Sequence, residues 1–178
     1  MVSKLLIVLL VLFSVSVTAP AATIFYTVSE LSDTTPGEDL WRYEYAVTGR
    51  DFLASEFFDV YFDPNLYGTL TAGPAPNADW DVAILQQPNP ANLPPFDRGM
   101  FDAFALTGGP SLSGTFSVDF VYLGSGVPGR QPFEIFSADA DLVERGFTSL
   151  IPEPATTALC LIGLICTIGL HRKLQLQR

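Results

Sequence analysis

The sequence predicts an all-β protein: a single antiparallel β-sandwich or jelly-roll domain, flanked by an N-terminal signal helix and a C-terminal hydrophobic helix. Three observations lead to this prediction. No long apolar pattern of helical period occurs between residues 23 and 149. Short segments rich in β-branched and aromatic residues alternate there with turn formers. The two long apolar runs lie near the ends of the chain, at residues 5–17 and 155–170.

Several central segments show the two-residue period of a half-buried strand. Phe116, Val118 and Phe120 share one face of their segment, and Tyr43 and Val47 share one face of another. Strands of this length, separated by turn signals, are typical of sandwiches and jelly rolls. The segments expected to form strands are 24–28, 40–47, 57–62, 80–85, 100–106, 113–122 and 131–136.

The central segment is strongly anionic. The whole chain has 9 Lys and Arg against 19 Asp and Glu, for a net charge of -10, and no lysine lies between residues 23 and 151. A surface of this sign repels phosphate groups, and no Lys/Arg cluster is present that could release counterions. Nucleic acid is therefore excluded as a partner.

The central segment also lacks the residues that most hydrolases need. Cys160 and Cys166 lie in the C-terminal apolar run, and the single histidine, His171, follows it. Serine triads, Ser-Lys catalysis, thiol chemistry and zinc sites are therefore excluded, and we expect a non-enzymatic domain without a cofactor or metal. Two alternatives stay open: a carboxylate-dependent glycosidase, and calcium bound by the oxygen-rich turns 33–39 and 63–65, which are more simply read as solvated turns.

Residues 1–21 have the order of a secretory signal peptide. Lys4 precedes the apolar run, and small residues follow it at Ala19 and Ala21. We expect signal peptidase to cut after Ala21, with the position after Ala22 as the alternative. An uncleaved membrane anchor is less consistent with the run, which is shorter than the approximately 20 residues of a spanning helix.

Residues 151–178 have three parts in a fixed order. Pro152, Glu153 and Pro154 place one carboxylate between two residues that oppose regular backbone hydrogen bonding. An apolar segment follows at 155–170, and a basic tail at 171–178 closes the chain. The positive-inside rule places the tail in the cytoplasm and the motif on the outer face of the inner membrane. The apolar segment is near the short limit for a span, as suits a segment that is held briefly and then removed.

This order of signal peptide, Pro-Glu-Pro motif, apolar helix and basic tail resembles the PEP-CTERM sorting architecture of exported proteins. The resemblance implies cleavage near the motif by exosortase, a transpeptidase-like membrane enzyme, in a Gram-negative bacterium that makes exopolysaccharide. The tail departs from the family, because residues 174–177 dilute its basic charge. A simple tail-anchored protein is the alternative.

A second pattern resembles exported PEP-CTERM proteins. A strand of the form Gly-x-Phe-Ser-Val-x-Phe at 114–120 is followed by a Gly-rich turn and by Pro-Gly-x-Gln-Pro-Phe-Glu-Ile at 128–135. We read this stretch as a β-hairpin in which Phe133 and Ile135 return to the core.

Two tryptophans offer an alternative function. Trp41 and Trp80 begin strands beside aspartates, and aromatic faces on β-sandwiches bind sugars, so these residues are candidates for stacking on exopolysaccharide. Their simpler interpretation is as core aromatics.

The expected organisation of the whole chain is a signal peptide at 1–21, a β-sandwich at 22–150 and a sorting segment at 151–178. The expected location is the inner membrane transiently, then the cell surface, extracellular space or extracellular matrix.

Overall fold

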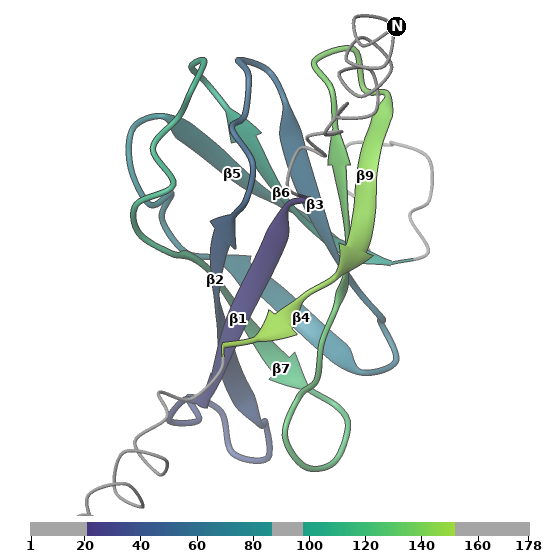
Figure 1. Ribbon diagram of the computed structural model, residues 1–178. Helices are drawn as coiled ribbons and strands as arrows, with labels where there is room; N and C mark the ends of the chain where they lie inside the picture. The colour runs from purple at the N-terminus through teal and green to yellow at the C-terminus, as the bar shows by residue number, and fades with distance from the viewer. Residues whose placement is uncertain (1–20, 87–97, 152–178) are drawn as a thin grey trace, which may run out of the picture.

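The computed structural model describes residues 21–86 and 98–151, and these form two five-stranded sheets packed face to face (Figure 1). Ten strands make up the sandwich. Their bounds are β1 Thr23–Glu30, β2 Leu40–Thr48, β3 Phe57–Phe62, β4 Tyr67–Ala72, β5 Trp80–Leu85, β6 Gly99–Ala105, β7 Phe116–Tyr122, β8 Pro132–Phe136, β9 Leu142–Phe147 and β10 Ser149–Leu150.

The first sheet, called sheet A here, has the strand order β10-β1-β2-β7-β4. The pairings among β1, β2, β7 and β4 are antiparallel, and the short β10 pairs with β1 in parallel. The second sheet, sheet B, has the order β5-β6-β3-β8-β9 and is antiparallel throughout. Strand β3 is therefore the central strand of sheet B, with β6 on one side and β8 on the other.

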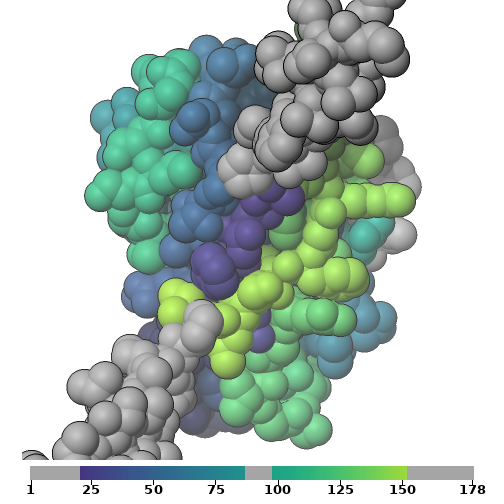
Figure 2. Space-filling view, in the orientation of Figure 1, coloured from purple at the N-terminus to yellow at the C-terminus, as the bar shows by residue number. Residues whose placement is uncertain are grey.

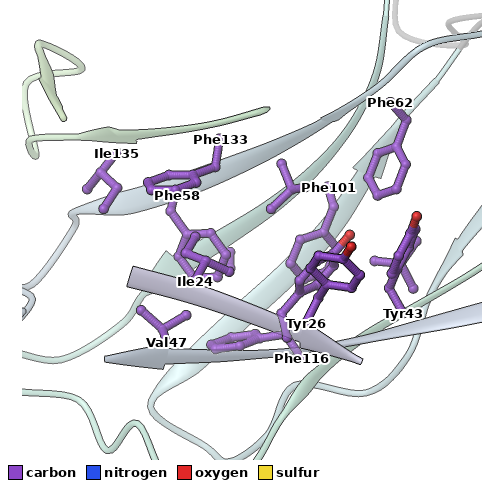
Figure 3. Packing of buried hydrophobic residues seen from close by; sticks show 14 of the residues in the cluster. Ile24, Tyr26, Tyr43, Val47, Phe58, Phe62, Phe101, Phe116, Phe133 and Ile135 are labelled. Atoms are coloured by element: carbon purple, nitrogen blue, oxygen red, sulfur yellow. The ribbon is translucent and has the colours of Figure 1, made fainter. Parts of the chain in front are cut away.

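The core between the sheets is rich in aromatic rings. The expected inward faces are confirmed, since Tyr43 and Phe120 are fully buried and their rings stack at 4.8 Å. Phe58 of sheet B meets Phe116 of sheet A edge-on, with 5.1 Å between the ring centroids. Figure 3 shows Tyr43, Phe58, Phe116 and other side chains of the two sheets pointing toward one another. Burial of such large apolar side chains, each worth about 1.5–3 kcal/mol, is the main source of the sandwich's stability.

All seven expected segments contain strands, but the sheets hold three more. Strand β4 contains Gly68 and β9 contains Gly146, and neither has a continuous β-branched or aromatic pattern. Strand β10 is only two residues long, and its parallel pairing makes sheet A mixed rather than purely antiparallel. These strands lie at sheet edges, where pairing to a neighbour rather than two buried faces holds them in place.

The hairpin expected at 114–136 is wrong. Strand β7 pairs with β2 and β4 in sheet A, whereas β8 pairs with β3 and β9 in sheet B, so the Gly-rich connection crosses from one sheet to the other. Phe133 and Ile135 nevertheless enter the core as expected, with exposures of 4% and 0%. The alternation specified the buried face, but it carried no information on which sheet each strand joins.

Within the described ranges, no helix is long and apolar enough to cross a membrane. The signal helix expected at 5–17 and the hydrophobic helix expected at 155–170 lie outside these ranges.

Candidate functional site

The outer face of sheet B carries a row of three acidic side chains. Because Phe58 and Val60 point into the core, the alternating residue Asp59 of β3 points to the opposite face. The strand register places Asp59 directly opposite Asp102 of β6 on one side and Glu134 of β8 on the other. Side chains directly opposite on neighbouring strands are about 4.5–5.5 Å apart at Cβ, so the three carboxyl groups form one cluster.

Two members of the row have raised pKa values. Asp59 is only 4% exposed, and burial, followed by the neighbouring Asp102, raises its pKa to about 8. Burial also raises the pKa of Asp102, although the hydrogen bond from Asp59 acts in the opposite direction. Among the described residues no N–H or hydroxyl group reaches Asp59 Oδ1, and the side chain is hydrogen-bonded to that of Asp102 instead. Asp59, with its pKa raised to about 8, therefore holds its proton at neutral pH.

Tyr61 connects the row to a cation. Its hydroxyl lies 2.9 Å from Glu134 Oε2, to which it donates, and 3.3 Å from Asp59 Oδ2. Burial and the nearby acidic groups raise the pKa of Tyr61, so its hydroxyl remains a donor. The guanidinium carbon of Arg98 lies 4.9 Å from the centre of the Tyr61 ring. Acceptors, a hydroxyl group and a cation thus meet on one patch of the sheet.

An aromatic row lies beside the acidic row. Phe57 of β3 stacks on Phe136 of β8 at 4.9 Å and on Phe104 of β6 at 6.3 Å. All three rings are partly exposed on the outer face. The face therefore combines an apolar strip with a strip of hydrogen-bonding groups.

A hollow of about 390 Å³ opens on this face. It is lined by Phe57, Asp59, Tyr61, Arg98, Met100, Phe136 and Ala140. A second hollow of about 310 Å³ shares Tyr61 and Arg98 with the first and extends toward Asp63 and Asn65. The first volume falls within the range of small-molecule sites, which are mostly apolar with a few convergent polar groups. We call this first hollow and its lining residues the outer-face pocket.

The tryptophans that the sequence offered for sugar stacking are both buried. Trp80 is 3% exposed, packs edge-on against Phe52 and Phe116, and donates from Nε1 to the carbonyl of Ser111. Trp41 is 9% exposed and donates from Nε1 to Asp39 Oδ1 at 2.7 Å. The simpler interpretation, core aromatics, is the one the structure supports. Neither ring presents the exposed platform that stacking on exopolysaccharide requires.

The turns considered for calcium use their oxygens within the chain. Asp33 Oδ1 accepts from the backbone of Leu40, and Asp63 Oδ1 accepts from both the backbone and the side chain of Asn65. These are the local hydrogen bonds by which Asp shapes a turn. Within 21–86 and 98–151 no group of three or more His, Cys, Asp or Glu side chains is arranged to hold a metal ion.

The predicted processing positions fall at the limits of the described ranges. Ala19 and the motif Pro152, Glu153 and Pro154 lie outside them. Ala21 is exposed at the beginning of the first described range, and Ala22, 6% exposed, is already part of the core.

Sequence reasoning missed the outer-face pocket, although it predicted all three of the central strands that carry it. The alternation in 57–62 places Asp59 and Tyr61 on one face, which was a usable signal. The alternation does not give the register of β3 against β6 and β8. Asp102 and Glu134 pair with Asp59 although they are 43 and 75 residues further along the chain.

No protein-family model matches the chain, and no curated protein matches it. Among solved structures, it is similar to a cohesin module from the family 33 glycoside hydrolase of Clostridium perfringens ATCC13124, with 10% sequence identity. The match covers 73% of this chain and 98% of the module, with a TM-score of 0.36. At this identity and TM-score the similarity does not bear on function.

Proposed function

We propose that the chain is a non-enzymatic exported protein of the cell surface or extracellular matrix, sorted through its Pro-Glu-Pro signal and processed by exosortase. One observation supports this most directly. The ten strands run from Thr23 to Leu150, between the expected cleavage after Ala21 and the motif that begins at Pro152. Removal of both end segments would therefore leave all ten described strands in place.

The contacts at the last described residues support the same proposal. Ser149 and Leu150 pair with β1, and the backbone N–H of Ile151 donates to the carbonyl of Tyr26 at 2.9 Å. The chain is thus hydrogen-bonded to β1 up to Ile151, the residue before the motif. A cut within or after the motif leaves these hydrogen bonds in place.

Mass spectrometry of the mature protein tests this proposal. We expect both ends to be trimmed, with the new C-terminus near Pro152–Pro154, and Glu153→Ala to abolish C-terminal trimming because it removes the displayed carboxylate. Glu30→Ala, which removes an exposed carboxylate at the end of β1, serves as the control and should leave the C-terminal cut unchanged. Recovery of intact Arg178 from exported protein, or normal trimming of the Glu153 variant, would contradict the proposal.

The outer-face pocket supports a second candidate function, the binding of a neutral saccharide. Sugars present C–H faces that pack on aromatic rings and hydroxyl groups that pair with carboxylates and guanidinium groups. Phe57, Tyr61 and Phe136 offer rings, while Asp59 and Arg98 offer polar partners. The net charge of -10 on the chain opposes an anionic ligand.

Retention on polysaccharide gels tests this second function. Tyr61→Ala should reduce retention at least severalfold, since stacking and hydrogen bonding are both lost. Phe147→Ala is a matched control, because Phe147 is also an aromatic residue beneath a guanidinium group, that of Arg130, but lies outside the pocket. Equal retention of the two variants and the unaltered protein would dismiss this function.

The arrangement of the acids also favours a non-enzymatic role. Glycosidases separate their two carboxyl groups by about 5–10 Å to admit the glycosidic oxygen or a water molecule. Asp59 and Asp102 are instead direct cross-strand neighbours in one row on one sheet face, rather than two groups facing each other across a cleft. We therefore place the glycosidase alternative behind saccharide binding.

A further inference from the structure

The backbone of Ala22, which precedes β1 of sheet A, contacts sheet B. Ala22 is 6% exposed, and its backbone N–H donates to Glu144 Oε2 at 3.1 Å. Glu144 belongs to β9, the edge strand of sheet B, whereas Ala22 leads into β1 of sheet A. Figure 2 shows the purple atoms of β1 beside the yellow-green atoms of residues 142–150. This hydrogen bond joins the two sheets across one side of the sandwich.

The backbone at this point is held closely by its neighbour. Gly49 has a φ of +81°, and a Cβ atom there would lie 2.7 Å from the carbonyl oxygen of Ala21. Only glycine allows both the conformation and the approach. The same Cβ atom would lie 3.7 Å from the Cα of Ala22, so Gly49 borders Ala22 as well, and this neighbour and the bond to Glu144 both remain after a cut that removes Ala21.

We propose that removal of the signal peptide between Ala21 and Ala22 replaces this neutral amide donor by an ammonium group, which forms an ion pair with the Glu144 carboxylate, so that processing itself strengthens the connection between the sheets. The inference rests on the export step of the proposed function. Signal peptidase adds water across the Ala21–Ala22 amide, which leaves a carboxylate on Ala21 and an amine on Ala22. The amine takes up a proton near neutral pH, since α-amino groups have an ordinary pKa of about 7.7–8.0.

The geometry favours this cut over the alternative after Ala22. Cleavage one residue later would discard a buried residue and move the ammonium to Thr23, which already lies in β1 opposite Thr48. Cleavage after Ala21 places the new charge on the atom that already faces Glu144. The acceptor is a carboxylate before and after the cut, so the gain comes from the positive charge that the new ammonium donor brings next to it.

The composition of the chain makes this ammonium separately measurable. Lys4 and Lys173 are the only lysines, and both lie in segments expected to be removed. In the fully processed protein the α-amine of Ala22 is then the only primary amine. An amine-specific acetylating reagent should add one acetyl group per chain, and a second acetyl group would locate an untrimmed Lys173.

The test compares acetylation in the mature unaltered protein and in Glu144→Gln, after mass spectrometry has identified the N-terminal residue. The carboxylate favours the protonated, unreactive amine, so we expect the variant to be acetylated about tenfold faster, as one pKa unit corresponds to a factor of ten. Acetylation should lower the Tm of the unaltered protein by about 4 °C and leave that of Glu144→Gln nearly unchanged. Glu30→Gln, an exposed change at the other end of β1, should behave like the unaltered protein.

An N-terminus other than Ala22, or equal effects of acetylation on the Tm of both proteins, would overturn the inference. If the Glu144 variant does not fold, the Tm of the unaltered protein before and after acetylation is compared alone, and an unchanged Tm would overturn the inference. Two acetyl groups per chain, one of them on Lys173, would contradict the proposed C-terminal processing and leave the Ala22 measurement readable by peptide mapping.

Discussion

Asp59 is an acidic residue at the centre of a sheet, where its charge is not solvated. Its pKa is raised because burial disfavours the ionised form and because Asp102 lies directly opposite. Asp59 therefore holds its proton at neutral pH, and Tyr61 donates to Glu134 in the same row. The outer-face pocket therefore presents a hydrogen-bonded acidic patch that carries less negative charge at neutral pH than its residue count implies.

This protonation predicts how stability depends on pH. The folded-state pKa of Asp59, about 8, lies above its unfolded value, so the folded protein keeps a proton that the unfolded chain loses as pH rises. Its contribution is complete below pH 4 and is lost as pH rises through 8. Asp59→Asn stays neutral, so from pH 4 to pH 8 its unfolding free energy should rise relative to the unaltered protein's, by on the order of 5 kcal/mol.

Urea unfolding at several pH values measures this difference. Asp51→Asn is the control, because Asp51 is exposed and its substitution removes the same formal charge. A pH-independent difference between Asp59→Asn and the unaltered protein would show that Asp59 is ionised in the folded state.

At the scale of elements, Gln131 explains why the turn before β8 has its sequence. Its side chain is 1% exposed, and Nε2 lies 2.6 Å from the hydroxyl of Tyr43, 2.8 Å from that of Tyr67 and beside the carbonyl of Gly129, so its two N–H groups are shared among three acceptors. Its backbone N–H donates to Thr148, between β9 and β10. One amide thus joins β2 and β4 of sheet A to the entry of β8 in sheet B.

Replacing this residue should destabilise the sandwich. Gln131→Leu leaves buried hydroxyl groups without their donor, and each unsatisfied buried group costs about 1–3 kcal/mol, so we expect a loss of about 2–4 kcal/mol in urea unfolding. Tyr45→Phe serves as the graded comparison, since Tyr45 donates to Gln131 Oε1 at the longer distance of 3.3 Å. Its cost should be about 1 kcal/mol. Equal costs for the two variants would mean that the network does not depend on the Gln131 donor.

At the scale of the whole molecule, the sandwich is closed along one side by its two ends. The strand β10 pairs with β1, Ile151 donates to Tyr26, and Ala22 donates to Glu144. The expected cuts fall just outside these contacts. Processing at both ends would therefore leave the described strands and these contacts in place. We therefore expect the trimmed protein to stay folded, so that mass spectrometry can be applied to folded, exported protein.

The sequence by itself determined the all-β class, the central strands and their buried faces, because period-two alternation such as Phe116-Val118-Phe120 follows directly from strand geometry. The signal peptide and the Pro-Glu-Pro sorting segment remain predictions from the sequence alone. Only the tertiary structure decided that β7 and β8 belong to different sheets, and that Asp59 meets Asp102 and Glu134. Register and sheet membership depend on contacts between residues far apart in the chain, which a local pattern does not encode.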